Sequence, residues 1–189
     1  SNQTEEATVE WRQSGLHNVT NAIAATMAAH TIGISVNQAC AALSDFIGVK
    51  RRMEVIYSDC NVTVYDDFAH HPTAIKTTLE GLRAKVGSEF ILAIIESRSA
   101  TMRMGVHGHN LASSVLSADQ VMWYQNSAVN WDMADLSQHA SLSCSVVNDL
   151  EKLIEMTRSS IQEKTHIVIM SNGGFEGFHE KLLKSFHHN

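Results

Sequence analysis

The residues best suited to chemistry lie in one run, residues 65–72, which reads Tyr-Asp-Asp-Phe-Ala-His-His-Pro. A β-branched stretch at residues 62–64 precedes the run, and an amphipathic helix pattern follows it. The run is therefore predicted to form a turn between a strand and a helix, which is where open α/β sheets bind ligands. Carboxylates at such a turn suit hydrogen bonding to ribose hydroxyls, and imidazoles beside a helix N-terminus suit contact with phosphate.

Each of these side chains also has an ordinary structural explanation. Asp66 and Asp67 point to opposite sides of a strand, so only one of them faces a given cleft. Either acid could instead cap the helix that starts at Pro72, and His70 and His71 could be surface or packing residues. A zinc site is disfavoured because no third or fourth ligand has suitable spacing, and we expect no metal ligands in this chain.

A second candidate site is the stretch Ser-Asn-Gly-Gly-Phe-Glu-Gly at residues 171–177, between the last strand pattern and the last helix pattern. Its glycines allow close backbone approach, and exposed amides suit anion or carbonyl recognition. A tight strand-to-helix connection explains it equally well. The stretch is not GxGxxG, and the chain contains no GxxxxGK[ST] loop, which disfavours a nicotinamide site and a phosphate-binding Walker loop.

A third candidate is Arg98, which follows the most apolar strand pattern in the chain. At the end of a parallel strand, its guanidinium could grip a carboxylate in a bidentate manner. The alternative is an ordinary surface arginine.

The elements that position these residues alternate between strands and helices from residue 53 onward. This order predicts an α/β domain with a Rossmann-like, mostly parallel sheet and flanking helices. The predicted strands are residues 53–57, 62–65, 90–95, 120–124 and 166–170, and the predicted helices are residues 73–85, 109–116, 148–160 and 176–186. Residues 126–145 are poorly periodic and are interpreted as a loop with a short helix or an edge strand.

Residues 1–49 are predicted to be a separate part, with a strand at residues 7–11 and helices at residues 16–30 and 36–46. Two helices and one strand cannot bury a core alone. We therefore interpret residues 1–49 as the incomplete, mostly helical end of one domain and residues 50–189 as a second domain.

Net charge, apolar runs and cysteine spacing indicate which partners and which cell compartment the sequence favours. The net charge of −6 over 189 residues argues against a nucleic-acid backbone as the main partner. No apolar run approaches the roughly 20 residues needed to span a bilayer, and the polar N-terminus does not read as a signal peptide. Three widely spaced cysteines without a CxxC motif are typical of reduced, cytoplasmic thiols.

Several motifs in combination resemble the Mur ligase family. Residues 15–22 match the GxHNxxNxxAA helix start of that family, and residues 51–54 match its RRxE junction into the C-terminal domain. The pairing of Asp-Asp-Phe-Ala-His-His-Pro-Thr-Ala-Ile with Ser-Asn-Gly-Gly-Phe resembles the branch that ligates a recycled cell-wall tripeptide. The resemblance extends from about residue 8 to residue 186.

The resemblance implies a three-domain, ATP- and Mg²⁺-dependent ligase in the cytoplasm. It would join the tripeptide L-Ala-γ-D-Glu-meso-diaminopimelate to UDP-N-acetylmuramate through an acyl phosphate. Its role would be in peptidoglycan recycling, and hence in cell-wall biogenesis, cell shape and cell division. This chain would be the end of the central ATP-binding domain plus the C-terminal domain, and it would be inactive without the missing domains. The alternatives are another Mur-type or folylpolyglutamate-type ligase and a stand-alone nucleotide-binding module.

The resemblance also implies a role for individual residues. His17, Asn18 and Asn21 would lie near adenine. Arg52 would contact the nucleotide, and Asp67 would reach the ribose. His70 would act catalytically beside the γ-phosphate and acyl phosphate. The implied ATP-binding set is His17, Asn18, Asn21, Arg52, Asp67 and His70. The implied peptide-binding set is His71, Arg98, Asn172, Gly173 and Gly174. The chain departs from the family pattern at Ser97, Ala100 and Glu176, where proline, asparagine and glycine are expected.

Overall fold

A computed structural model describes residues 6–11, 13, 15–97, 108–125 and 143–187. The chain divides into two compact units, Ser1–Val49 and Lys50–Asn189. In the described part, no helix is both long enough and apolar enough to cross a membrane.

The first unit consists of helices α1 (Leu16–Thr31) and α2 (Val36–Ser44). Both were predicted, and α2 starts with a capping box in which Ser35 and Gln38 exchange hydrogen bonds. The predicted strand at residues 7–11 is wrong, because these residues lie outside any strand or helix. A strand needs a neighbouring strand to bond to its backbone, and the described elements of this unit are helices.

Helix α1 exposes the apolar stripe that the sequence predicts. Leu16, Val19, Ile23 and Met27 are between 45% and 80% exposed, and α1 contains no buried residue. An amphipathic helix normally buries this stripe against a core. The first unit, taken by itself, therefore does not cover the apolar face of its longest helix.

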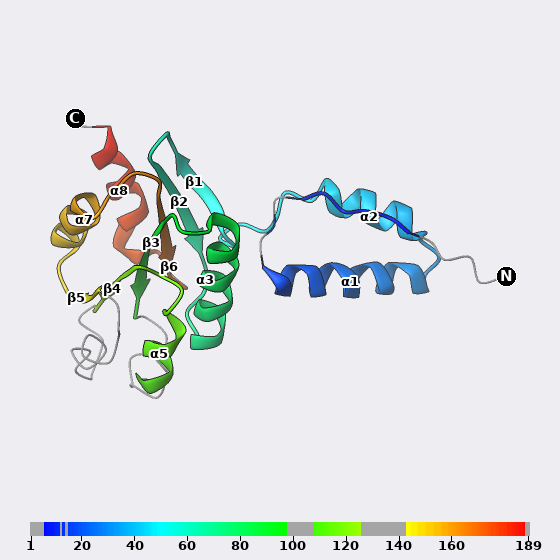
Figure 1. The fold of residues 1–189 in the computed structure, drawn as a ribbon, viewed down its shortest axis with the longest axis horizontal. Helices are drawn as coiled ribbons and strands as arrows, with labels where there is room; N and C mark the ends of the chain where they lie inside the picture. The colour runs from blue at the N-terminus through cyan, green and yellow to red at the C-terminus, as the bar shows by residue number, and fades with distance from the viewer. Residues whose placement is uncertain (1–5, 12, 14, 98–107, 126–142, 188–189) are drawn as a thin grey trace. The chain divides into compact units, whose positions relative to one another are not determined.

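The second unit is built on a six-stranded sheet in the order β1-β2-β6-β3-β4-β5 (Figure 1). Strand β1 is antiparallel to β2, and every other neighbouring pair is parallel. The strands are β1 (Glu54–Ser58), β2 (Val62–Asp67), β3 (Phe90–Glu96), β4 (Gln120–Tyr124), β5 (Ser143–Val147) and β6 (Thr165–Met170). The predicted mostly parallel sheet is confirmed, and the poorly periodic region ends in the edge strand β5.

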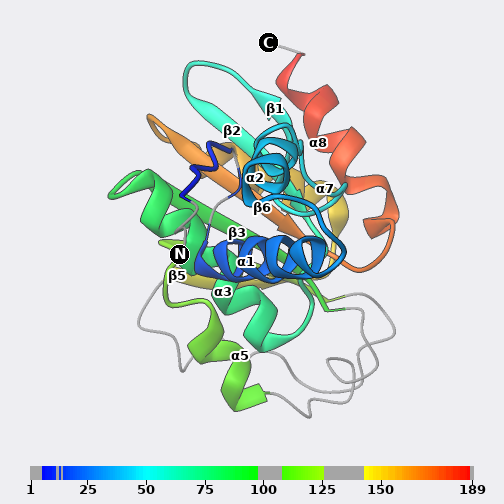
Figure 2. The ribbon, with the colours of Figure 1, turned by 90° about the vertical axis from the view of Figure 1, so that its right-hand side faces the viewer.

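Helices cover both faces of this sheet (Figures 1 and 2). The helices are α3 (Pro72–Val86), α5 (Gly108–Ser114), α7 (Leu150–Ser159) and α8 (Phe178–Phe186). One core contains α3 and α5 packed against Tyr65, Ile95 and Met170. The other core contains α7 and α8 packed against Val64, Ile94 and Ile169. Successive strand residues thus enter opposite cores, so consecutive polar residues at a strand end also lie on opposite faces.

Candidate functional site

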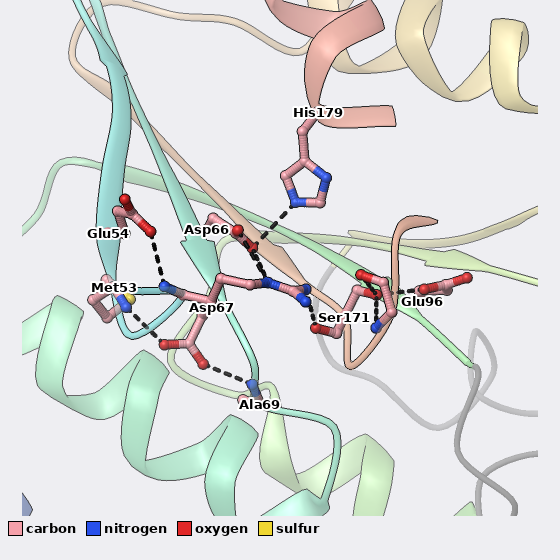
Figure 3. A network of polar contacts seen from close by, with 10 residues as sticks. Met53, Glu54, Asp66, Asp67, Ala69, Glu96, Ser171 and His179 are labelled. Carbon is pink, nitrogen blue, oxygen red and sulfur yellow. Dashed lines mark hydrogen bonds and ion pairs between the residues drawn. The ribbon is translucent and has the colours of Figure 1, made fainter. Parts of the chain in front are cut away.

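The carboxylate of Asp67 holds the turn after β2 together. Its Oδ1 accepts a hydrogen bond from the Ala69 N–H at 2.8 Å, and its Oδ2 accepts one from the Met53 N–H at 2.8 Å (Figure 3). Burial raises the pKa of Asp67 above its ordinary value, although these two backbone hydrogen bonds act in the opposite direction. The residue is only 2% exposed. In this structure Asp67 therefore positions backbone, which differs from the direct ribose contact implied by the family resemblance.

His70 uses one ring nitrogen for a hydrogen bond within the turn. Its Nδ1 donates to the carbonyl oxygen of Phe68 at 2.9 Å, because a carbonyl can only accept. The half-buried ring also meets the Phe68 ring edge-on, with centroids 5.4 Å apart. Nε2 is consequently the nitrogen left to contact a ligand, as an acceptor when the ring is neutral and as a donor when it is protonated.

The Phe68 ring also contacts two arginines at the start of the second unit. The guanidinium carbons of Arg51 and Arg52 lie 5.2 Å and 5.6 Å from its ring centroid, within cation–π range. Arg52 is exposed, so its guanidinium borders solvent beside the turn. The turn thus combines an imidazole with the exposed guanidinium of Arg52, an arrangement suited to phosphoryl oxygens.

Helix α3 begins directly at this turn. Pro72 occupies the first turn of the helix as predicted, and the N-cap is His71, whose Nδ1 accepts from the Thr73 N–H at 3.3 Å. The alternative in which an aspartate caps this helix is wrong, because Asp67 is bonded to Ala69 and Met53 instead. The N-terminus of α3 therefore adds partial positive charge to the turn.

Asp66 lies on the opposite face and forms a second network (Figure 3). Its carboxylate pairs with Nε of Arg51 at 3.2 Å and accepts from Nε2 of His179 on α8 at 3.2 Å. Burial acts to raise the pKa of Asp66, but the hydrogen bonds and charges of His179 and Arg51 outweigh it and hold the pKa below its ordinary value. The two adjacent aspartates are therefore shifted in opposite directions.

This lowered pKa predicts a pH-dependent contribution to stability. Because Asp66 has a folded pKa below 3.8, its contribution is complete above pH 3.8 and is lost as the pH falls through the folded pKa. We expect the Asp66→Asn variant to lose less free energy of unfolding than the wild type between about pH 6 and pH 3. Urea unfolding at both pH values measures this difference, and equal losses in the two proteins would show that Asp66 is not the group involved.

The loop after β6 is tied to the same edge of the sheet. Nη2 of Arg51 donates to the carbonyl oxygen of Ser171 at 2.6 Å. The Ser171 hydroxyl donates to the buried carboxylate of Glu96 and accepts from the Gly173 N–H at 2.9 Å (Figure 3). Arg51 therefore links the turn after β2 to the glycine-rich loop after β6, and Ser171 links that loop to the end of β3.

The glycine-rich loop continues through an unusual backbone conformation. Phe175, Glu176 and Gly177 have φ values of 47°, 49° and 76°, the left-handed region that favours glycine. These residues form a 3-10 turn, and α8 begins only at Phe178, two residues later than predicted. Glu176, which departs from the family pattern, accepts from the Tyr124 hydroxyl at 3.1 Å. Burial and this carboxylate raise the pKa of Tyr124 to about 12.

The structure brings together most of the predicted residues of the second unit. Asp67, His70 and His71 lie at the turn after β2, and Arg52, which precedes β1, contacts the Phe68 ring of that turn. The loop of Asn172, Gly173 and Gly174 follows the adjacent strand β6. The remaining predicted residues are not joined to them here: Arg98 lies outside the described residues, and His17, Asn18 and Asn21 lie on α1 in the first unit.

Four residues of the site were not predicted as site residues: Arg51, Phe68, Glu96 and His179. Glu96 had a usable signal, since it is a carboxylate directly after an apolar strand. His179 had no such sequence signal, because it lies 113 residues from Asp66 in the sequence. The described residues contain no group of three or more His, Cys, Asp or Glu side chains that could hold a metal ion.

Comparison with known proteins identifies the relatives of this chain. Residues 51–173 match the family described as Mur ligase, glutamate ligase domain. Haemophilus influenzae UDP-N-acetylmuramate–L-alanyl-γ-D-glutamyl-meso-2,6-diaminoheptandioate ligase is 43% identical over 178 residues, which are 94% of this chain and 39% of that protein. The crystal structure of a murein peptide ligase from Psychrobacter arcticus has a TM-score of 0.74 and 45% identity, covering 96% of this chain and 39% of that one.

A more distant structure shares the fold. The MurF ligase from Thermotoga maritima, solved in complex with ADP, has a TM-score of 0.68 and 16% identity, covering 94% of this chain and 41% of that chain. The chain thus spans about two fifths of the length of each of these proteins.

Proposed function

Because the chain belongs to the Mur ligase family, we propose that it forms the C-terminal part of an ATP-dependent amide-forming ligase. The ligase would join L-alanyl-γ-D-glutamyl-meso-diaminopimelate to UDP-N-acetylmuramate, as the names of its relatives suggest. In the proposed reaction, ATP supplies the phosphoryl group that activates the sugar carboxylate as an acyl phosphate, and the amine of the tripeptide displaces the phosphate. Such a ligase would serve peptidoglycan recycling.

The first unit supports a role within a longer protein. The chain spans 39% of the Haemophilus influenzae relative, and the apolar stripe of α1 is exposed. We propose that residues 1–49 are the end of a central ATP-binding domain whose body covers this stripe. His17, Asn18 and Asn21 are proposed to contact adenine from α1. A cytoplasmic location is proposed as well, and the free cysteines Cys40, Cys60 and Cys144 fit it.

One observation carries the proposal for the second unit. The two family-like loops follow adjacent parallel strands, β2 and β6, and Arg51 bonds to Asp66 before the first loop and to the Ser171 carbonyl before the second. Ligands of open α/β sheets bind outside the carboxyl ends of such strands. The proposed phosphate contact at the turn and the proposed peptide contact at the glycine-rich loop would then lie side by side, which is the positioning that acyl-phosphate aminolysis requires.

Each residue of the turn has a proposed role. His70 would donate from Nε2 to a phosphoryl oxygen, and Arg52 would neutralise charge on the nucleotide. Asp67 is proposed as a positioning residue that holds both through Ala69 and Met53, in place of a direct ribose contact. Mg²⁺ has no cluster of ligands among the described residues, so no role of this chain is routed through it.

The peptide is proposed to lie along the loop after β6, within reach of His71, Arg98, Asn172 and the backbone of Gly173 and Gly174. Gly174 carries a specific argument for this placement. Its φ is −83° and its ψ is −6°, which any residue adopts, and a Cβ built there meets no atom within 4 Å. The fold alone therefore does not require glycine at this position, whereas close approach of a ligand does.

We expect Gly174→Ala to leave the stability unchanged or raise it slightly, since alanine loses less backbone entropy on folding. The same change should raise the KM for the tripeptide by about tenfold, because an added methyl group displaces the ligand by a few tenths of an ångström or more. Thermal unfolding and steady-state kinetics on the full-length enzyme measure the two effects.

Gly87→Ala is the matched control for this prediction. Gly87 has a φ of 64° and also has no atom within 4 Å of a built Cβ. Gly87 also has a ψ of −116°, a conformation that strains a residue with a Cβ, so alanine there should cost about 1–3 kcal/mol of stability without changing the KM for the tripeptide. If Gly174→Ala instead lost stability and left the kinetics unchanged, the loop would have a structural role only.

The proposed function can be tested by domain exchange. The aligned segment of the Haemophilus influenzae relative is replaced by this chain, and product formation from ATP, UDP-N-acetylmuramate and tripeptide is followed by mass spectrometry. The proposal predicts an ATP-dependent product with the mass of both substrates less one water. A folded chimera that binds ATP but forms no such product would contradict it.

A further inference from the structure

The glycine-rich loop after β6 is attached at both of its ends to one ion pair. Before the loop, Nη2 of Arg51 donates to the carbonyl oxygen of Ser171 at 2.6 Å. After the loop, Nε2 of His179 in the first turn of α8 donates to Oδ1 of Asp66 at 3.2 Å (Figure 3). Arg51 and Asp66 themselves pair at 3.2 Å. The side chains of Arg51, Asp66 and His179, which we call the Asp66 cluster, therefore connect the two ends of the loop.

The chemistry of the Asp66 cluster suits a lasting attachment. The Asp66 carboxylate only accepts hydrogen bonds, so Nε2 of His179 carries the proton between them. His179 and Arg51 hold the pKa of Asp66 below its ordinary value, so the carboxylate is ionised at neutral pH. The side chains of Asp66 and His179 are only 13% and 19% exposed. Salt screens such partly buried charges less than surface pairs, so we expect the attachment to persist at physiological salt.

The second half of the loop has a strained backbone that its own contacts hold. Phe175 and Glu176 have φ values of 47° and 49°, and residues other than glycine keep such values only where the surrounding structure fixes them. Phe175 is fully buried and stacks on Phe178, with ring centroids 4.8 Å apart, and Glu176 accepts from the Tyr124 hydroxyl. These contacts do not involve residues 172–174, which are half-buried or exposed.

Ser171 fixes the first half of the loop. Its hydroxyl accepts from the Gly173 N–H at 2.9 Å, and its own N–H donates to the carbonyl oxygen of Asp67 at 3.1 Å. Its carbonyl oxygen is the group that Arg51 holds. Because this carbonyl and the Asn172 N–H belong to one planar peptide unit, the hydrogen bond from Arg51 also orients the start of the loop.

We infer that the Asp66 cluster holds the glycine-rich loop in place for the incoming peptide, so that Arg51, Asp66 and His179 are positioning residues. The inference rests on the proposed function, which assigns the peptide to this loop. The two neighbouring acids of β2 then serve different parts of the site. Asp67 fixes the turn that is proposed to contact phosphate, and Asp66 fixes the loop that is proposed to contact the peptide.

The test uses His179, because this residue bonds to Asp66, whereas Arg51 also contacts the Phe68 ring of the turn after β2. In the full-length enzyme, His179→Ala should speed hydrogen exchange of the backbone amides of residues 171–177 about tenfold, the fold-change of one hydrogen bond to a charged group. The variant should also raise the KM for the tripeptide about tenfold and leave the KM for ATP unchanged. Hydrogen exchange followed by mass spectrometry and steady-state kinetics measure these effects.

A conservative variant and a matched control accompany this test. His179→Gln should restore both properties, because the glutamine amide supplies an N–H donor about where Nε2 lies. Lys181→Ala is the control on the same helix, since Lys181 pairs with Glu151 of α7 at 3.9 Å and the two side chains are 48% and 78% exposed. Such a surface pair contributes little, so the control should change neither the exchange nor the KM for the tripeptide.

Unchanged hydrogen exchange of residues 171–177 in His179→Ala would overturn the inference, and so would faster exchange with an unchanged KM for the tripeptide. Equally faster exchange throughout the second unit would also overturn it, because His179 would then only stabilise the fold. A wild type that ligates no tripeptide would instead reject the proposed function, while hydrogen exchange would still decide whether the Asp66 cluster holds the loop.

Discussion

Replacing Asp67 by alanine should lower the free energy of unfolding of the second unit by about 3 kcal/mol, because it leaves one buried and one partly buried N–H group without acceptors. These are the N–H groups of Met53 and Ala69, each now bonded at 2.8 Å. Each orphaned donor costs about 1–3 kcal/mol. The variant recovers part of this cost, because burial disfavours the Asp67 carboxylate, as its raised pKa indicates. Urea unfolding followed by fluorescence of the fully buried Trp123 measures the result.

Asp59→Ala is the control for the Asp67 prediction. The Asp59 carboxylate also accepts two backbone N–H groups, those of Asn61 and Val62, at 2.8 Å and 2.7 Å. Asp59 is exposed, so water replaces the lost acceptor and the cost should stay at or below about 1 kcal/mol. Similar losses in the two variants would show that burial does not set the effect.

Replacing His70 by alanine should lower kcat of the full-length enzyme by about 10²–10³-fold, the usual effect of deleting one donor to developing charge. The structure supports this size of effect because Nδ1 is committed to Phe68, so Nε2 is oriented before a substrate binds. Stability should change little, because the ring is only half-buried. The KM for the tripeptide should also change little. Single-turnover kinetics separates the chemical step from binding and product release.

Imidazole rescue distinguishes a chemical role of His70 from a structural one. Added imidazole should restore part of the activity of His70→Ala, since the small ring can enter the vacated space and supply the same donor. It should not restore Gly174→Ala, in which no imidazole is missing. An inactive His70→Ala variant without any rescue, accompanied by lost stability, would indicate that His70 only shapes the turn.

The sequence identified the turn after β2 because several local signals agree there. The strand pattern ends, Pro72 opens a helix, and polar residues fill the interval, so the loop and its place in the sheet follow from short-range rules. The direction of the two aspartates does not follow from such rules. Val64 and Tyr65 are both buried, so β2 has no polar face, and the pattern cannot tell which acid turns inward.

The contacts across the site depend on tertiary packing that one sequence does not encode locally. His179 reaches Asp66 only because α8 packs over one face of the sheet, and Phe68 meets both arginines only because the junction folds back, with the Phe68 N–H donating to the Arg51 carbonyl oxygen at 2.9 Å. The hydrogen bond from the Ser171 hydroxyl to the buried Glu96 carboxylate likewise becomes apparent only once β3 and β6 are known to be neighbours.

The central claim is that this chain belongs to a ligase whose acceptor is a tripeptide rather than a single amino acid. The most direct measurement is kcat/KM of the full-length enzyme for the tripeptide and for L-alanine, at saturating ATP and UDP-N-acetylmuramate. We predict a preference for the tripeptide of at least about 100-fold, because the contacts proposed for the loop after β6 would be reached only by the longer acceptor. Equal use of the two acceptors, or a preference for L-alanine, would contradict the account.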